Sequence, residues 1–148
     1  MFQGKWYGEV PVGETFGTRV TVTETHLVLA AGLFGDFNPL HVDEVHAAAS
    51  RFGSRILHGP FTAALATAPV GMFFSGTAIA YLEHHCEFKL PVRPGDTLAS
   101  QWKVIEKLDK PKHKGGIFVL EGTVTNQSGE LVASAAGKIL VASKPSAP

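Results

Sequence analysis

The pattern of hydrophobic and polar residues changes in the second half of the chain, where β-branched and aromatic residues dominate. Four long stretches of this kind are typical of β-strands: 77–90, 97–108, 116–127 and 130–142. Turn-forming residues separate them, at 93–96, 111–116 and 126–129. Long strands joined by tight turns predict an antiparallel meander with one apolar face.

The first half contains shorter elements. The β-branched residues in 19–23 alternate with other side chains and predict a short strand. Thr23 is placed to act as the N-cap of an apolar helix that begins at Glu24. This helix is expected to end near Gly32 or Gly35.

Proline divides the segment that follows. Asn38 precedes Pro39 and is pushed toward extended geometry, so residues 35–41 are not expected to form regular helix. Asp43 is expected to cap a second short helix that runs through Ala49.

A helix of small residues is the best candidate for the centre of the fold. Pro60 suits the first helical position because its missing N–H would be unpaired there. Residues 61–68 are mostly small, which lets a helix lie close to a sheet, and Pro69 must kink or end this helix. Wrapping the sheet around the helix predicts a single α+β domain over residues 1–148, with a frayed tail at 144–148.

Composition and charge narrow the class of protein. Of 148 residues, 45% are hydrophobic, and 13 basic residues balance 13 acidic ones. Neutral charge argues against nonspecific nucleic-acid binding, and no segment approaches the ~18 uncharged apolar residues of a membrane helix. The single cysteine, Cys86, has no intramolecular disulfide partner, which fits a reducing compartment. We expect a soluble cytoplasmic protein without nucleic-acid or membrane partners.

One loop carries a pattern that favours acid–base chemistry. Asp36 and His41 lie five residues apart, and Pro39 breaks the helix between them, so the loop can bring both side chains to one spot. A carboxylate and an imidazole supply a base and an acid near neutral pH, and general acid–base catalysis of this kind accelerates reactions by roughly 10²- to 10⁴-fold. Ordinary ionisation favours Asp36 as the base that activates water and His41 as the proton donor, although burial can reverse these roles.

The start of the central helix supplies a second element. The N–H of Gly59 should lack an intrahelical partner and lie at the positive end of the helix dipole, so it can stabilise an oxyanion. Pro60 has no N–H, which excludes a two-donor site, and His58 is interpreted as structural. An acid–base pair beside one donor suits water addition to an α,β-unsaturated carbonyl compound, or the reverse reaction.

These residues resemble the signature of the MaoC-like dehydratases, which include the (R)-specific enoyl-CoA hydratases. The similar string runs Gly35-Asp-Phe-Asn-Pro-Leu-His41-Val-Asp43, followed by Ala47 and by His58-Gly59. The resemblance extends over most of the chain, with further similar segments at 12–14, 21–24, 88–92 and 94–96. The resemblance implies the hot-dog fold, in which an antiparallel sheet wraps around a long helix.

The resemblance also implies roles. Asp36 and His41 would be the catalytic pair and Gly59 the oxyanion donor, and a hydroxyl at Thr67 would support the pair. Independently of the resemblance, Asn38 is expected to fix the loop through side-chain to backbone hydrogen bonds. The substrate would be a trans-2-enoyl-CoA, hydrated reversibly to the (R)-3-hydroxyacyl form without a cofactor. The family usually forms dimers.

Three alternatives stay open. Acyl carrier protein could replace CoA as the thioester carrier. A hot-dog thioesterase would need a carboxylate near the central helix, and residues 60–74 contain none. A noncatalytic acyl-thioester-binding subunit would not need both Asp36 and His41.

Three further groups of residues are candidates for metal, phosphate or acyl-chain binding. Residues 84–87 offer two candidate ligands on each strand face, fewer than zinc requires, so no metal site is predicted. A solvated turn is favoured over phosphate binding for the basic residues of 107–114. Other candidate contacts to CoA phosphates are Arg51, Arg55 and Lys89. Apolar side chains that could line an acyl tunnel, with Phe37 and Phe61 as the predicted substrate contacts, are Phe34, Phe37, Phe61, Met72, Phe73 and Phe74.

Overall fold

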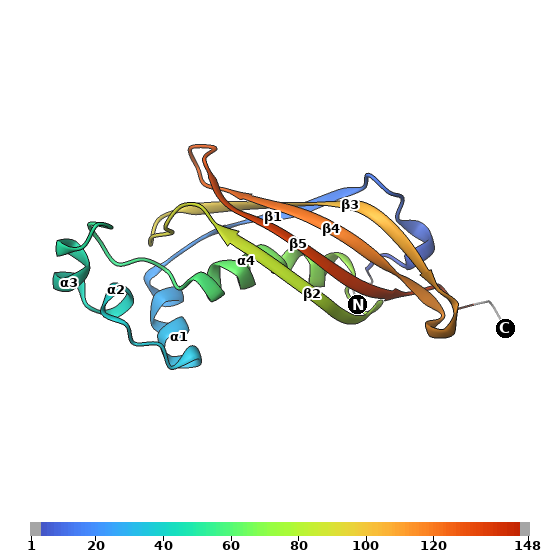
Figure 1. The fold of residues 1–148 in the computed structure, drawn as a ribbon, viewed down its shortest axis with the longest axis horizontal. Helices are drawn as coiled ribbons and strands as arrows, with labels where there is room; N and C mark the ends of the chain where they lie inside the picture. The colour runs from blue at the N-terminus through green and yellow to red at the C-terminus, as the bar shows by residue number, and fades with distance from the viewer. Residues whose placement is uncertain (1–3, 146–148) are drawn as a thin grey trace.

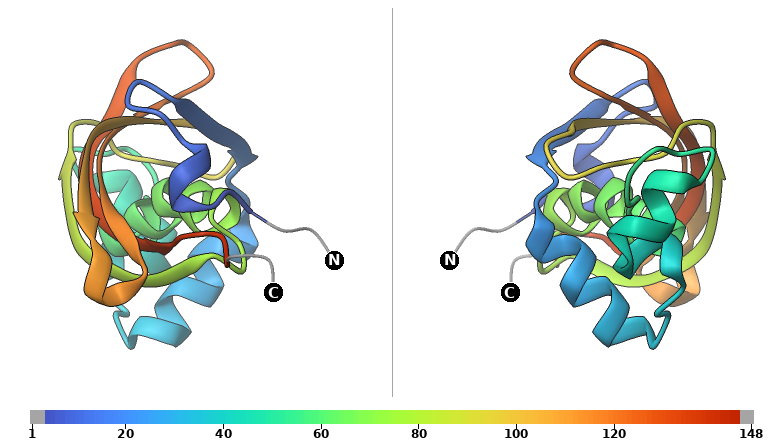
Figure 2. Two further views of the ribbon diagram at one scale, coloured as in Figure 1. Left: turned by 90° about the vertical axis from the view of Figure 1, so that its right-hand side faces the viewer. Right: turned by 90° about the vertical axis from the view of Figure 1, so that its left-hand side faces the viewer.

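A computed structural model describes residues 4–145, which form a curved five-stranded antiparallel sheet around one long helix (Figures 1 and 2). The strands are β1 (Thr15–Thr21), β2 (Ala78–Phe88), β3 (Thr97–Lys110), β4 (Gly115–Thr125) and β5 (Leu131–Ala142). The helices are α1 (Glu24–Phe34), α2 (Pro39–Val42), α3 (Glu44–Ala49) and α4 (Gly59–Phe73), with 3-10 turns η1 (Tyr7–Glu9) and η2 (Pro111–His113). This arrangement confirms the α+β class and the hot-dog fold. Residues 146–148 of the predicted frayed tail lie outside the described residues.

The order of the strands corrects the predicted meander. Neighbours in the sheet run β1-β3-β4-β5-β2, so only β3, β4 and β5 follow one another as in a meander. β2 pairs with β5 and not with β3, with Tyr81 opposite Ile139. The turn at 93–96 connects β2 to β3, which are not neighbours in the sheet. Its backbone instead forms hydrogen bonds with Val22, just after β1. The prediction was wrong because turn residues indicate a change of direction but not which strand is met next.

Helix α4 continues through Pro69, so of the two predicted effects of this proline, a kink or an end of the helix, the end does not occur. It spans 15 residues, and Pro69 and Val70 are both buried. Small residues permit the close approach to the sheet: the indole N–H of Trp102 donates to the backbone carbonyl of Ala66 at 2.7 Å. Burial against the sheet therefore holds the helix past the one hydrogen bond that proline removes.

Strand β1 begins four residues earlier than predicted and ends two residues earlier. It pairs with β3 from Thr15 opposite Lys103 to Thr21 opposite Thr97. Gly17 has a low strand propensity, which explains why the start of β1 was not predicted. Glycine is required at this position, because a Cβ would lie only 2.1 Å from the backbone oxygen of Ser100. Long-range pairing thus overrides the weak local strand propensity.

The short helices α1, α2 and α3 lie beyond one end of the sheet, and the β3–β4 turn lies at the opposite end (Figure 1). Thr23 occupies the N-cap position of α1 as predicted, and Gly35 ends the helix with a left-handed φ of 68°. Within residues 4–145, no helix is both long and apolar enough to cross a membrane. The cytoplasmic location stays a prediction.

Candidate active site

The loop between α1 and α3 is folded by its own side chains. The Asp36 carboxylate accepts the N–H of Asn38 at 3.1 Å, and the Asn38 side-chain oxygen accepts the N–H of Leu40 at 3.0 Å. Asn38 is extended, as its position before proline predicts, but Pro39 then starts the one-turn helix α2. The prediction that residues 35–41 contain no helix was therefore wrong at its end, because proline is compatible with a first turn.

This local folding brings Asp36 and His41 together. Asp36 Oδ2 lies 3.9 Å from His41 Nε2, too far for a direct hydrogen bond but close enough for one water molecule to contact both. The Asp36 side chain is 51% exposed, whereas the His41 side chain is 13% exposed. A half-solvated carboxylate therefore stands beside a largely buried imidazole.

A main-chain carbonyl holds one nitrogen of the His41 ring. His41 Nδ1 lies 2.7 Å from the carbonyl oxygen of Ile56. A carbonyl only accepts hydrogen bonds, so Nδ1 carries a proton and donates it to this bond. Nε2 is consequently the ring nitrogen left to exchange a proton near Asp36.

Gly59 begins α4 beside His41. The N–H groups of Phe61 and Thr62 both bond to the carbonyl of His58, whereas the N–H of Gly59 has no backbone acceptor among the described residues. His41 and Gly59 line a cavity of about 340 Å³ that is closed on another side by residues 88–92; Asp36 does not line it directly. The N–H at the start of α4 is available to an oxygen atom bound in this cavity.

His58 contacts both members of the pair, which the sequence interpretation of this residue as structural did not foresee. Its ring stacks on His41 with centroids 3.7 Å apart and an interplanar angle of 24°. Its Nε2 lies 2.9 Å from the carbonyl oxygen of Asp36. The side chain is almost fully buried.

Asp36, His41 and His58 are also close enough to be considered as metal ligands, since one ligand atom from each lies within 4.8 Å of the others. A metal ion lies in the plane of an imidazole ligand, and the nearly parallel stacked rings direct their nitrogen lone pairs along separate planes. His58 Nε2 is in addition bonded to the carbonyl of Asp36. The arrangement therefore suits proton transfer better than metal binding.

Several predicted contact residues are not brought to this cavity. The Thr67 hydroxyl donates to the carbonyl of Ala63 and lines a separate hollow with Tyr81, so in this chain it does not reach the acid–base pair. Phe37 is 64% exposed, and Phe61 packs on Phe34 with ring centroids 6.0 Å apart. The aromatic walls of the cavity are instead Phe52 and Phe88.

The other proposed tunnel residues also lie elsewhere. Phe73 and Phe74 stack on the first strand and the sheet core through Phe16 and Phe118, and Met72 is exposed. Their positions place them at the far half of α4, away from its Gly59 end. Sequence reasoning missed Phe88, although the segment 88–92 was singled out by the family resemblance.

The basic residues separate into free and occupied groups. Arg51 and Lys89 line the cavity, and Lys89 is paired with Glu87. Arg55 instead bridges Glu24 of α1 and Glu44 of α3, which raises the pKa of its guanidinium. Arg51 is the cavity cation without an ion pair among the described residues.

The basic β3–β4 turn lies at the other end of the molecule (Figure 1). Lys107 donates to the backbone carbonyls of Tyr7 and Val10, at 2.9 and 2.7 Å, and is thereby used to hold the N-terminal segment. This placement favours the predicted solvated turn over a phosphate-binding site.

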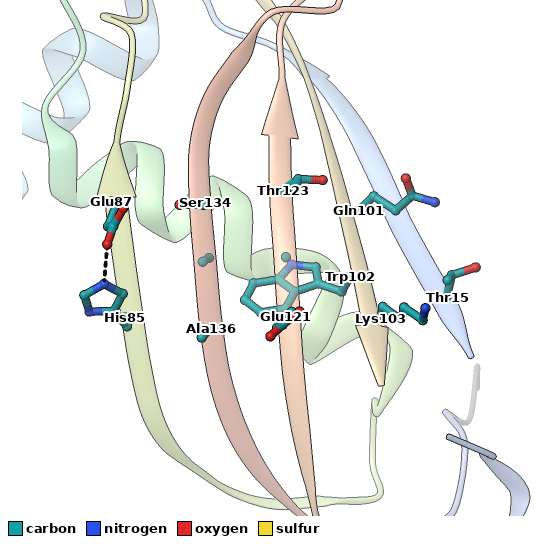
Figure 3. A pocket seen from close by; sticks show the side chains of 12 residues that line it. Thr15, His85, Glu87, Gln101, Trp102, Lys103, Glu121, Thr123, Ser134 and Ala136 are labelled. Atoms are coloured by element: carbon teal, nitrogen blue, oxygen red, sulfur yellow. Dashed lines mark hydrogen bonds and ion pairs between the residues drawn. The ribbon is translucent and has the colours of Figure 1, made fainter. Parts of the chain in front are cut away.

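A second hollow, of about 560 Å³, lies on the face of the sheet turned away from α4 (Figure 3). His85 and Glu87 form an ion pair at its edge, 3.4 Å apart, and small residues such as Ser134 and Ala136 form its floor. His84 and His85 each contact a different neighbour, Tyr81 and Glu87.

Burial raises the pKa of the Cys86 thiol, which disfavours a nucleophilic thiolate there.

Comparison with known proteins identifies the family. Residues 9–126 match the family described as MaoC like domain, and the chain belongs to this family. It is similar to an (R)-specific enoyl-CoA hydratase of Rhodospirillum rubrum, with 29% identity over 92% of this chain and 91% of the relative.

Solved structures agree with this relationship. The R-hydratase PhaJ1 of Pseudomonas aeruginosa superposes with a TM-score of 0.83 and 31% identity, covering 97% of this chain and 93% of that one. A Mycobacterium tuberculosis protein described as having a double hotdog fold gives a TM-score of 0.86 at 18% identity, covering 98% of this chain and 46% of that one. This last likeness concerns the fold alone.

Proposed function

We propose that the chain is an (R)-specific enoyl-CoA hydratase, which adds water reversibly to a trans-2-enoyl-CoA to give the (R)-3-hydroxyacyl-CoA. The observation that carries this proposal is the 3.9 Å gap between Asp36 Oδ2 and His41 Nε2, beside a cavity that contains the N-terminus of α4. Family membership and hydratase relatives support the reaction class.

The proposed reaction follows from this geometry. Asp36 takes a proton from the water, and the water oxygen forms a bond to the β-carbon of the thioester. Electrons of the double bond move to the carbonyl oxygen, and the resulting enolate accepts a hydrogen bond from the Gly59 N–H. In this cycle His41 starts with a proton on Nε2 as well as on Nδ1. The enolate collapses as its α-carbon takes the Nε2 proton, which leaves His41 neutral with Nδ1–H, and the proton held by Asp36 then returns to Nε2 through solvent.

Gly59 is the single backbone donor in this proposal, because Pro60 has no N–H. A side chain at position 59 would also press on the cavity wall, since its Cβ would lie 3.1 Å from a ring carbon of Phe88. One oxyanion donor of this kind contributes roughly 2.7–4 kcal/mol to transition-state stabilisation.

CoA is the proposed carrier, because the unpaired Arg51 at the cavity matches the phosphate groups of a nucleotide carrier. Acyl carrier protein is the alternative carrier. We also propose a homodimer: β2 is an edge strand paired only with β5, and its apolar residues Ile79 and Leu82 are about half exposed. Light scattering after gel filtration measures this oligomeric state.

The test of the activity is hydration of crotonyl-CoA, followed by the loss of absorbance of the conjugated thioester. The configuration of the product is read with dehydrogenases specific for (R)- or (S)-3-hydroxyacyl-CoA. Oxidation only by the (R)-specific enzyme is expected. Absence of hydration with enoyl thioesters of several chain lengths and both carriers would refute the proposal.

A further inference from the structure

His58 occupies a position that packing alone does not explain. Its side chain is 1% exposed, and Nδ1 is the one buried side-chain nitrogen or oxygen without a hydrogen-bond partner in residues 4–145. Leaving a buried polar atom unpaired costs about 1–3 kcal/mol. An apolar side chain at the start of α4 would avoid this cost in folding free energy, so contacts specific to histidine must account for its presence.

The two contacts that His58 does make both reach the acid–base pair. The carbonyl of Asp36 can only accept, so His58 Nε2 carries a proton and donates it over 2.9 Å. This bond anchors the backbone of the residue that carries the carboxylate. The flat face of the same ring covers the His41 imidazole at 3.7 Å.

Stacking restricts the one motion of His41 that its other bond leaves free. The bond from Nδ1 to the carbonyl of Ile56 holds one corner of the ring, but the ring can still pivot about that corner. The stacked His58 ring, inclined by 24° with its centroid 3.7 Å away, blocks tilting of the imidazole out of its plane and so keeps Nε2 on the side where Asp36 lies. Displacement of a reacting group by about 1 Å can cost about 10²-fold in rate.

We propose that His58 is a positioning residue, which sets the distance between Asp36 and His41 through a ring stack on one and a backbone hydrogen bond to the other. This inference rests on the proposed hydration reaction. It assigns no proton transfer to His58. It requires the two properties that histidine combines, a flat face and an N–H in the plane of the ring.

Three variants test the proposal by steady-state kinetics with crotonyl-CoA. His58→Leu removes both contacts and is expected to lower kcat by about 10- to 100-fold, while KM changes less than about threefold. His58→Phe keeps the stack and is expected to recover at least about threefold in kcat relative to His58→Leu. The control is Thr77→Val, which removes a buried hydroxyl that donates to the carbonyl of Lys5, at the opposite end of α4.

The control separates positioning from loss of stability. Thr77→Val is expected to lower the melting temperature while kcat stays within about twofold of wild type. The proposal is overturned if His58→Leu keeps kcat within about twofold, or if kcat falls in proportion to melting temperature in both proteins. If His58→Leu does not fold, His58→Phe decides, because loss of the donor alone must still lower kcat by more than about twofold.

A spectroscopic measurement distinguishes failure of this inference from failure of the proposed function. Nitrogen-15 chemical shifts of the His41 ring report which nitrogen carries the proton, with or without activity. Wild type is expected to hold Nδ1–H, and His58→Phe to hold it more fully than His58→Leu. Identical tautomer populations in all three proteins would overturn the positioning role, whereas a wild-type enzyme without hydratase activity would overturn the function.

Discussion

Replacing Asp36 with asparagine tests the proposed base with almost no change in shape. The asparagine oxygen can still accept the N–H of Asn38, which Asp36 accepts at 3.1 Å. Its NH₂ group then stands where Oδ2 now lies, 3.9 Å from His41 Nε2, and cannot take a proton from water. The loop should therefore keep its fold and lose its base.

The magnitudes differ for stability and for rate. The Asp36 side chain is 51% exposed, so the free energy of unfolding should change by no more than about 0.5 kcal/mol. Loss of a general base should lower kcat/KM by about 10²- to 10⁴-fold, which corresponds to about 2.7–5.4 kcal/mol of transition-state stabilisation. A large loss of rate without a loss of stability is the expected result.

The matched control is Asp43→Asn. Asp43 lies in the same segment and accepts the N–H of His46 at 3.0 Å as the N-cap of α3. Asparagine caps helices about as well as aspartate, so this variant should keep both rate and stability. Initial rates with crotonyl-CoA and urea unfolding compare the two variants. An Asp36→Asn rate within about threefold of wild type would refute Asp36 as the base.

Three further predictions concern binding and stability. Arg51→Ala should raise KM for crotonyl-CoA about tenfold but leave KM for crotonyl-pantetheine unchanged, because Arg51 lines the cavity; equal effects would argue against phosphate recognition. Burial and the hydrogen bond to Asp109 raise the pKa of Tyr7 from 10.0 to about 12. The contribution of Tyr7 to the free energy of unfolding is therefore fully present below pH 10 and is lost as the pH rises through 12. Urea unfolding from pH 9 to 12 should show this loss in wild type, and Tyr7→Phe should lack that component of the loss. Gly116→Ala should cost at least about 1–3 kcal/mol, since its Cβ would lie 2.1 Å from the Tyr7 ring, whereas Gly32→Ala, on an open helix face, should stabilise by about 0.5–1 kcal/mol; thermal unfolding compares them.

The sequence predicted the fold well where the determinants are local. The left-handed Gly35 ends α1, Asn38 is extended before proline, and Asp43 caps α3, as expected from the neighbouring residues. It failed where distant contacts decide. The placement of β2 beside β5 depends on the curved sheet, which no short segment of sequence describes. The same sheet decides between the two effects predicted for Pro69, because α4 packs against it and continues past the proline.

The candidate site divides in the same way. The short spacing from Asp36 to His41 and the proline between them indicated a meeting of the two side chains, and the structure brings them to 3.9 Å. The role that the family resemblance implies for Thr67 is not seen in this chain, because eight residues of α4 separate it from Gly59 and its hydroxyl donates to the carbonyl of Ala63. Phe88 was missed as a cavity wall, because it reaches Gly59 from the end of a distant strand.

Two main-chain carbonyls determine which ring nitrogen of each histidine donates a hydrogen bond, and their positions cannot be predicted from a pattern of residue types. The carbonyl of Ile56 accepts a hydrogen bond from His41 Nδ1–H, and the carbonyl of Asp36 accepts one from His58 Nε2–H. The adjacent rings therefore donate from different nitrogens, which leaves Nε2 of His41 to face the carboxylate of Asp36 at 3.9 Å. The backbone thus distinguishes two chemically identical side chains, one for proton exchange and one for support.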